Sequence, residues 1–218
     1  RLVQFLYEIT HCVCDGQLLR TYRLTAFAAD TASLLRLLQE QTERMTHMTK
    51  TLLEMSELRS VPCNDAIDLA PMIEEVLTGL APLAEQKGIT LVSKGDAQTI
   101  GCDTLIYRLL FNLVENAIRY SAPSSTVQIG ARAEGDRVLL RVRDQGPGIP
   151  KQYQTSIFQP FFRVDRSRSR AYGGVGLGLA LVWEIAALHG GSIEVEESSK
   201  RGTTMLVTLP TRALGSLK

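Results

Sequence analysis

The feature that most constrains this chain is a change in the spacing of its apolar residues near residue 62. Upstream of that point, seven positions follow each other with alternating steps of four and three. These positions are Leu34, Leu38, Gln41, Met45, Met48, Leu52 and Met55. Such steps form the a/d seam of a coiled-coil helix, so the pattern predicts one long helix over residues 34–58.

A second stripe of the same kind opens the chain. It steps by four, three and four through Leu2, Leu6, Ile9 and Val13. The stretch at 28–33 is small and polar enough to turn the chain, so the two helices are expected to form an antiparallel hairpin. A hairpin alone leaves its apolar stripes exposed, and pairing with a second copy into a four-helix bundle covers them. We therefore expect a homodimer; packing of the stripes on the rest of the chain alone is the alternative.

Downstream of residue 62 the apolar spacing no longer follows the seam. Residues 69–86 and 103–119 have the pattern of amphipathic helices. Runs rich in β-branched residues, separated by Gly, Asp and Ser turns, predict strands at 88–93, 126–134, 136–144, 191–198 and 203–210. Helices combined with strands that are mostly joined by hairpins predict an α+β sandwich.

Composition limits the classes of partner. A net charge of +1 over 218 residues gives no reason to expect a nucleic acid or a membrane surface as a partner through bulk charge. No apolar run reaches the roughly 18 residues that cross a bilayer. Four cysteines without paired C-x-x-C spacing favour reduced thiols in a cytoplasmic setting. The chain begins without Met, so we interpret it as a fragment and expect any inner-membrane anchor in upstream segments.

Two asparagines stand one turn apart on the predicted helix 103–119. In "LLFNLVENAIRYS", Asn112 and Asn116 share one face, and Arg119 and Tyr120 follow them. An amide on an otherwise apolar helix needs a polar partner, which a cation or a phosphate supplies. Two amides satisfied within the helix are the alternative interpretation.

A basic segment adjoins a run of glycines further along. Arg163, Arg166, Arg168 and Arg170 against Asp165 leave a charge of +3 in eight residues. Glycines 173, 174, 176 and 178 follow and open an apolar helix. Backbone N–H groups at a helix N-terminus beside guanidinium groups can form a polyphosphate site. A solvated basic loop is the alternative, but it does not explain the adjoining glycines.

Other phosphate-binding motifs are missing from the sequence. It has no G-x-x-x-x-G-K-[ST], and its glycines at 174, 176 and 178 do not fit the dinucleotide fingerprint. The H-R-D and D-F-G motifs of protein kinases are also missing. Ahead of the basic segment, "RDQGPGIP" places Asp144 before two glycines and two prolines, where the backbone turns sharply and can approach a ligand closely.

Four ordered motifs carry a resemblance to a known family. "NLVENAIRYS" resembles the N box of two-component sensor histidine kinases, "DQGPGIP" the first glycine box, "IFQPFFRVD" the F box and "GGVGLGLALV" the second glycine box. The resemblance covers nearly the whole chain. It implies a helical-hairpin dimerisation and phosphoacceptor domain at residues 1–62, followed by a Bergerat-type α/β sandwich at 63–218 that binds ATP and Mg²⁺.

The resemblance also implies roles for individual residues. Asn116, with Asn112 nearby, would ligate Mg²⁺ on the ATP phosphates, and Asp144 would accept a hydrogen bond from the adenine amino group. Tyr120 would pack on the base, Arg119 and Arg163 would face phosphate, and the later glycines would let a lid close. The full set implied at the nucleotide is Asn112, Asn116, Arg119, Tyr120, Asp144, Gly146, Gly148, Arg163, Gly174, Gly176, Leu177, Gly178 and Thr203.

His11 in "FLYEITH" occupies the place of the family's phosphoacceptor histidine. Helical spacing independently puts Glu8, His11 and Asp15 on a stripe separate from the seam, where another domain can reach the imidazole. Both carboxylates, one turn to either side, would raise the proton affinity of the ring and could orient it. A metal site with Cys12 and Cys14 is disfavoured, because those helix positions do not converge on one point.

The sequence after His11 departs from the family pattern. Where the family usually has an acidic residue and a Leu-Arg-Thr-Pro-like stretch, this chain reads "CVCDG". Asp15, one turn from His11, is our candidate for the catalytic carboxylate. The resulting prediction is autophosphorylation of His11 followed by transfer to an aspartate of a response regulator. A dimeric ATP-binding signalling module without phosphotransfer is the first alternative, and another Bergerat ATPase, which would not explain the heptad hairpin, is the second.

Overall fold

One mixed five-stranded sheet organises the larger part of the described chain. The computed structural model describes residues 64–164 and 176–211, together with Gln39, Thr42, Met45, Thr46, Thr49 and Leu53. The sheet runs in the order β2-β4-β5-β7-β6. Its strands are β2 (Thr90–Lys94), β4 (Thr126–Glu134), β5 (Arg137–Arg143), β6 (Ser192–Ser199) and β7 (Gly202–Pro210). All neighbours are antiparallel except β2 and β4, which are parallel.

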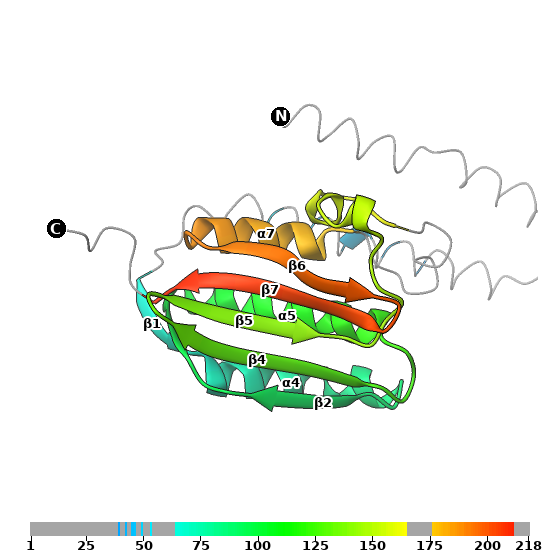
Figure 1. Cartoon of the computed structure of the whole chain (residues 1–218), viewed down its shortest axis with the longest axis horizontal. Helices are drawn as coiled ribbons and strands as arrows, with labels where there is room; N and C mark the ends of the chain where they lie inside the picture. The colour runs from blue at the N-terminus through cyan, green and yellow to red at the C-terminus, as the bar shows by residue number, and fades with distance from the viewer. Residues whose placement is uncertain are drawn as a thin grey trace, which may run out of the picture. The chain divides into compact units, whose positions relative to one another are not determined.

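Three helices cover one face of this sheet. They are α4 (Leu69–Glu85), α5 (Asp103–Tyr120) and α7 (Gly178–Leu188), and Figure 1 shows them behind the strands. A small antiparallel pair, β1 (Asp65–Asp68) with β3 (Gln98–Gly101), lies before α4 and α5 in the chain, and the 3₁₀ turns η2 (Lys151–Tyr153) and η3 (Ser156–Phe158) follow β5. The result is an α/β sandwich with one layer of helices and one layer of strands.

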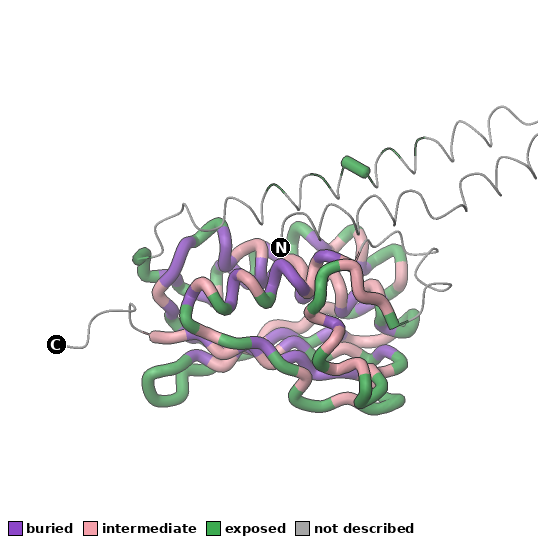
Figure 2. The backbone as a smooth tube through the Cα atoms, turned by 90° about the horizontal axis from the view of Figure 1, so that it is seen from above, coloured by how far each residue is buried: buried purple, intermediate pink, exposed green. Residues whose placement is uncertain are grey.

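The core lies between the two layers. Helix α5 is central: Leu109, Leu110 and Val114 are fully buried, and the alternate residues of β4 and β5, such as Ile129 and Leu140, meet them from the sheet. Each such aliphatic side chain stabilises the fold by about 1.5–3 kcal/mol relative to an exposed one. Figure 2 shows the buried residues gathered between helices and sheet, with exposed residues at the turns. The opposite face of the sheet carries the other residues of each strand and is turned away from the helices.

The N-terminal end of α5 is bonded to His189, a residue from the end of α7. At this N-terminus, the side chain of Cys102 makes no capping bond; instead the Cys102 N–H donates to His189 Nε2 at 3.0 Å. His189 Nδ1 lies 2.7 Å from the carbonyl oxygen of Ile185, so the ring is held as the tautomer with the proton on Nδ1. Its pKa is lowered by burial, against the smaller opposing effect of the bond to Ile185. His189 directly follows the last residue of α7.

The structure describes six residues upstream of residue 62. The chain divides into two units, residues 1–45 and 46–218. Gln39, Thr42 and Met45 in the first unit are helical and exposed, as are Thr46, Thr49 and Leu53 in the second. The predicted hairpin, its turn and the domain boundary after residue 62 stay predictions. Among the described residues, no helix is long and apolar enough to span a membrane.

The predicted sandwich is confirmed for residues 64–164 and 176–211. The two amphipathic helices were placed to within one residue at their ends, and all five predicted strands are present. The short pair β1 and β3 was missed, since each strand has four residues and no clear alternation of apolar and polar side chains. Two neighbouring pairs depart from hairpin-joined strands within the sheet: β2 and β4, which are parallel, and β5 and β7, which are antiparallel but separated in the chain by α7 and β6.

Candidate nucleotide-binding site

Asp144 stands at the end of β5, where the strand runs into the glycine-rich loop. Its Oδ1 accepts two backbone hydrogen bonds, from Gly146 N–H at 2.7 Å and from Thr203 N–H at 3.1 Å. Burial raises the pKa of this carboxyl, and the two N–H donors oppose that rise. Because both bonds end on Oδ1, the second oxygen is left to accept a hydrogen bond from another donor.

Glycines let three backbone segments approach this carboxylate. A Cβ on Gly146 would lie 2.6 Å from the carbonyl oxygen of Tyr120, and one on Gly148, at φ +76°, would lie 2.1 Å from that of Ser199. A Cβ on Gly202, at φ +135°, would lie 2.0 Å from the carbonyl oxygen of Asp144. Side chains at these positions would push the loop away from the end of α5 and from the β6–β7 turn.

Thr203 supports the same loop from the first residues of β7. Its side chain is buried, and its hydroxyl lies 3.2 Å from Ser198 Oγ. Ser198 Oγ in turn accepts the N–H of Ile149 at 2.7 Å. The backbone of Thr203 also accepts the Asp144 N–H at 2.9 Å. Thr203 is therefore bonded to Asp144 through both backbone groups, and it reaches the glycine-rich loop through Ser198.

The amide pair of α5 faces the beginning of α7. Asn112 and Asn116 are both half-buried, and a Cβ on Gly178 would lie 3.0 Å from Asn112 Oδ1 and 3.8 Å from Asn116 Nδ2. Asn112 Nδ2 donates to the Arg108 carbonyl at 2.8 Å, which turns its oxygen toward α7. The Asn112 amide oxygen lies next to a space that a Cβ would fill, and this suits a Mg²⁺ ion that keeps most of its waters and binds through few protein oxygens plus phosphate.

Helix α7 presents an uncapped N-terminus to these amides. Leu177, its N-cap residue, is buried and provides no side-chain acceptor, and the first helical bond runs from Leu181 N–H to the Leu177 carbonyl. The N–H groups before Leu181 in this turn have no acceptor within the helix, which favours an anion at this end. Gly176, at φ +82°, accepts the N–H of Phe161 at 2.9 Å and so joins the start of α7 to the F-box segment.

The remaining predicted residues lie around this centre. Arg119 forms an ion pair with Glu115 at 2.8 Å, one turn back on α5, and Tyr120 at the end of that helix is 48% exposed. Arg163 is half-buried and follows the F-box phenylalanines. His11, Asp15 and Gly174 lie outside the described residues. Among the described residues, no group of three or more His, Cys, Asp or Glu side chains could hold a metal ion.

Sequence reasoning missed a residue that holds the end of α5. Lys87, in the turn after α4, donates from Nζ to the carbonyl oxygens of Ile118, Arg119 and Ser121 at 3.0, 2.6 and 3.2 Å. Burial, and then repulsion by the Arg119 guanidinium, lower its pKa. The sequence carried no signal for this role, because the acceptors are backbone atoms more than thirty positions away. Gly202 was also missed, although a glycine before the threonines of "RGTT" could have indicated it.

The site and the fold define a nucleotide-binding domain in which amides, a helix N-terminus and a buried carboxylate lie on one side of an α/β sandwich. Residues 101–213 match the family model of histidine kinase-, DNA gyrase B- and HSP90-like ATPases, which is slightly more than half of the chain. The chain belongs to this family. Within it, the chain carries the catalytic core of a two-component sensor histidine kinase.

Individual relatives agree with this placement. The sensor-like histidine kinase SenX3 of Mycolicibacterium smegmatis is 36% identical over 177 residues, covering 78% of this chain and 46% of its own length. The mycobacterial sensor histidine kinase MprB has a similar structure, with 28% identity, a TM-score of 0.59, and 69% of this chain and 99% of that chain covered. The catalytic domain of histidine kinase ThkA gives 26% identity and a TM-score of 0.60, with 68% and 96% covered. This chain thus spans about half the length of the SenX3 proteins it matches.

Proposed function

We propose that this chain is an ATP-dependent protein histidine kinase core, in which the γ-phosphoryl group of ATP moves to His11 and then to an aspartate of a response regulator. The observation that carries the proposal is the convergence at one end of α5. The glycine-bounded Asp144 lies at one side of this end, and the amide pair faces the uncapped start of α7 at the other. A nucleotide has the matching polarity, with a hydrogen-bonding base at one end and an anionic polyphosphate at the other.

The base belongs at Asp144. Its Oδ2 can accept a hydrogen bond from the exocyclic amino group of adenine, while Oδ1 is fixed by the N–H groups of Gly146 and Thr203. A carboxylate held by two backbone donors does not need to reorganise when the base binds, which lowers the cost of binding. The backbone carbonyl of Tyr120 lies against Gly146, and the proposed role of the exposed Tyr120 ring is to cover one side of the base.

The phosphates belong between α5 and α7. The N–H groups of the first turn of α7 donate to phosphate oxygens, and Asn112 and Asn116 hold Mg²⁺, which neutralises phosphate charge when it is bound. Arg119 and Arg163 are proposed as further phosphate contacts, and Arg119 would exchange its ion pair with Glu115 for this purpose. Positioning and charge neutralisation of this kind provide most of the catalysis in phosphoryl transfer.

Transfer itself requires the imidazole of His11. A neutral ring nitrogen attacks the γ-phosphorus, the bond from that phosphorus to the bridging oxygen breaks, and ADP leaves with the electron pair. Asp15, one turn from His11, is the proposed acceptor for the proton on the other ring nitrogen. We further propose residues 1–62 as a dimerising hairpin, because Met45, on the predicted seam, is 54% exposed in the single chain.

Incubation with γ-labelled ATP and Mg²⁺ tests the proposal. The expected result is an acid-labile, alkali-stable label on the protein that is lost in His11→Gln, while ATP binding measured by calorimetry is retained. Label that persists in His11→Gln would overturn the assignment of the acceptor. Tight ATP binding with no label in the wild type would favour the signalling module without phosphotransfer, and no ATP binding would overturn the nucleotide site.

A further inference from the structure

One cross-strand row on the outer face of the sheet places two cations on either side of a glycine. Lys94 of β2 is the register partner of Gly130 of β4, and Gly130 is the register partner of Arg141 of β5. Lys94 and Arg141 are thus two strands apart, about 10 Å between their Cα atoms. Because Gly130 has no side chain, nothing from β4 separates the two cations within this row.

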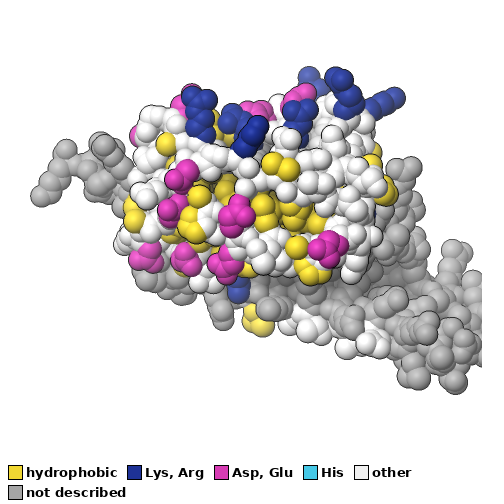
Figure 3. Space-filling model, turned by 90° about the horizontal axis from the view of Figure 1, so that it is seen from below, with side chains coloured by type: hydrophobic (Ala, Val, Ile, Leu, Met, Phe, Trp, Pro, Cys, Tyr) yellow, Lys and Arg dark blue, Asp and Glu magenta, His cyan; other side chains and the backbone are white. Residues whose placement is uncertain are grey.

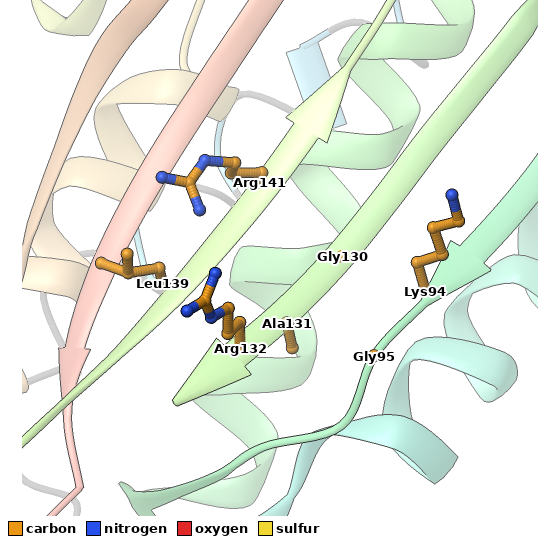
Figure 4. Close-up of a pocket in the computed structure, with 7 residues that line it drawn as sticks. All are labelled: Lys94, Gly95, Gly130, Ala131, Arg132, Leu139 and Arg141. Atoms are coloured by element: carbon orange, nitrogen blue, oxygen red, sulfur yellow. The ribbon is translucent and has the colours of Figure 1, made fainter. Parts of the chain in front are cut away.

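A third cation, Arg132, lies near Gly130. Arg132 lies two residues beyond Gly130 on the same strand and therefore on the same outer face. Figure 4 shows Lys94, Arg132 and Arg141 standing around Gly130, with Leu139 beside them. Together with Gly95 and Ala131 these residues line a hollow of about 330 Å³. The floor of the hollow is backbone, and its rim is cationic and partly apolar.

The three cations differ in their partners. Arg141 forms bonds of 2.8–2.9 Å through Nε and Nη2 to the Glu196 carboxylate on β6, so its guanidinium is held in place. Glu134 acts on Arg141 at longer range. Within residues 64–164 and 176–211, Lys94 and Arg132 have no ion-pair partner, and both are exposed. An anion near Gly130 would be attracted to both of these side chains.

The charge of the outer face is divided along the sheet. Strands β2, β4 and β5 carry five cations there, Lys94, Arg132, Arg137, Arg141 and Arg143, against the one carboxylate Glu134. The edge strand β6 carries Glu194, Glu196 and Glu197 instead. Figure 3 views the molecule from the side of β2 and α4, and Lys and Arg side chains gather along one border of this view. Cations therefore outnumber carboxylates on β2, β4 and β5, and this part of the outer face is its basic half.

We propose that this basic half of the outer face is a docking surface for an acidic segment of a partner protein, with one carboxylate of the segment seated over Gly130 between Lys94, Arg132 and Arg141. Charge complementarity supports this occupant: four net positive charges face outward on β2, β4 and β5, and the hollow has room for a side chain that the sheet itself does not supply. Half-exposed Leu139 at the rim fits the aliphatic part of a Glu side chain. This surface is separate from the nucleotide site, which lies among α5, α7 and the loop after β5.

Fluorescence anisotropy of the full chain with a labelled peptide of alternating Glu and Thr tests the proposal. The expected result is saturable binding that weakens as ionic strength rises, with no binding of the same peptide carrying Gln in place of Glu. Lys94→Glu with Arg132→Glu is expected to weaken binding at least about tenfold. Gly130→Val changes no charge but fills the hollow, and is expected to weaken binding several-fold. Thermal melting of each variant checks that it is folded.

A matched control separates this surface from net charge. Lys151→Glu with Lys200→Glu makes the same change in charge at exposed positions outside the outer face and is expected to leave peptide binding unchanged. Equal loss in both double variants would overturn the proposal, as would a single-stranded oligonucleotide that binds as well as the acidic peptide. Salt-sensitive self-association of the wild type through Lys94 and Arg132 would assign the surface to a second copy and also overturn it.

Discussion

The ammonium nitrogen of Lys87 lies 2.6 Å from the carbonyl oxygen of Arg119, the residue before the last of α5. The same ammonium reaches the carbonyls of Ile118 and Ser121, so a single cation binds three acceptors that the helix cannot satisfy by itself. A positive charge at this position is also favoured by the dipole of α5. The end of the helix that bears Tyr120, and that lies against Gly146, is held by a residue from the α4–β2 turn.

Replacing Lys87 by Met is expected to lower the free energy of unfolding by about 2 kcal/mol, because three carbonyls lose a charged donor and can recover only part of it from water. Urea denaturation followed by circular dichroism measures this. Lys151→Met removes an exposed ammonium group that forms no hydrogen bond among the described residues, and it is expected to change stability by less than about 0.5 kcal/mol. Equal effects of the two substitutions would contradict the role of Lys87.

The parts of the fold that the sequence predicted are those in which local pattern and packing agree. Helix α5 has one apolar face that is continuous over its length, and β4 and β5 alternate polar and apolar residues except at Leu139, so their positions followed from spacing. Contacts between distant segments could not be predicted from the spacing of apolar residues. The donor of Lys87 and its acceptors are separated by more than thirty residues, and neither "EQKGI" nor the end of the helix indicates the other.

Asp144→Asn separates binding from stability. Asn keeps an oxygen for the N–H groups of Gly146 and Thr203, but it places an amide donor where the proposed adenine amino group donates, so ATP affinity should fall at least about tenfold. Burial raises the pKa of Asp144, which means that ionisation in the folded state costs stability at neutral pH. The free energy of unfolding of the variant should therefore equal or exceed that of the wild type.

Calorimetry with a non-hydrolysable ATP analogue, and urea denaturation at pH 7, check the two parts separately. Unchanged affinity would remove Asp144 from the proposed adenine site. Weak binding together with lower stability would point instead to a collapsed loop. Thr155→Val, at an exposed position with no hydrogen bond from its side chain among the described residues, serves as a control for a neutral surface change.

His189 should make stability sensitive to acid. Its pKa in the folded state is lowered below the ordinary value near 6.5, because burial disfavours the charged form of the ring. The Nε2 atom that would take the second proton already accepts the Cys102 N–H. Below pH 6.5 the unfolded chain binds more protons at this residue than the folded chain. Stability from this group is thus present above about pH 6.5 and is lost as the pH falls toward the lower folded pKa.

The measurement is the free energy of unfolding in urea at several pH values between about 7.5 and 5. His189→Gln keeps an acceptor near Nε2 and cannot titrate, so its stability should fall less steeply over this range than that of the wild type. Carboxylates elsewhere contribute equally to both proteins and cancel in the difference. Parallel curves for the two proteins would show that protonation of His189 is not linked to unfolding.

The motifs predicted more of the proposed site residues than periodicity did, but they gave no distances between them. "NLVEN" indicated that Asn112 and Asn116 share a face, but it could not show that Gly178 leaves the space in front of Asn112 Oδ1. Nor could "RGTT" show that Gly202 must lack a side chain for its strand to pass the carbonyl of Asp144. Close approaches of backbone segments depend on how β7 pairs with β5, which only the assembled sheet defines.

Gly178→Ala provides the most direct test of the phosphate end of the site. The new methyl group would lie 3.0 Å from Asn112 Oδ1, and Asn112 can yield little because its Nδ2 is bonded to the Arg108 carbonyl. Alanine also favours a helix over glycine by up to about 1 kcal/mol. The strain at Asn112 opposes this gain, so we expect stability to be unchanged or lower, while Mg²⁺-dependent ATP affinity falls by roughly fivefold, equivalent to about 1 kcal/mol. Gly79→Ala is the matched control, since its methyl group would meet only the Tyr107 hydroxyl, at 3.7 Å, in the middle of α4. It should gain the same helix stability without any change in ATP affinity. If both glycine variants bind ATP with Mg²⁺ as the wild type does, the space between Asn112 and α7 is not where the phosphates and their metal ion lie.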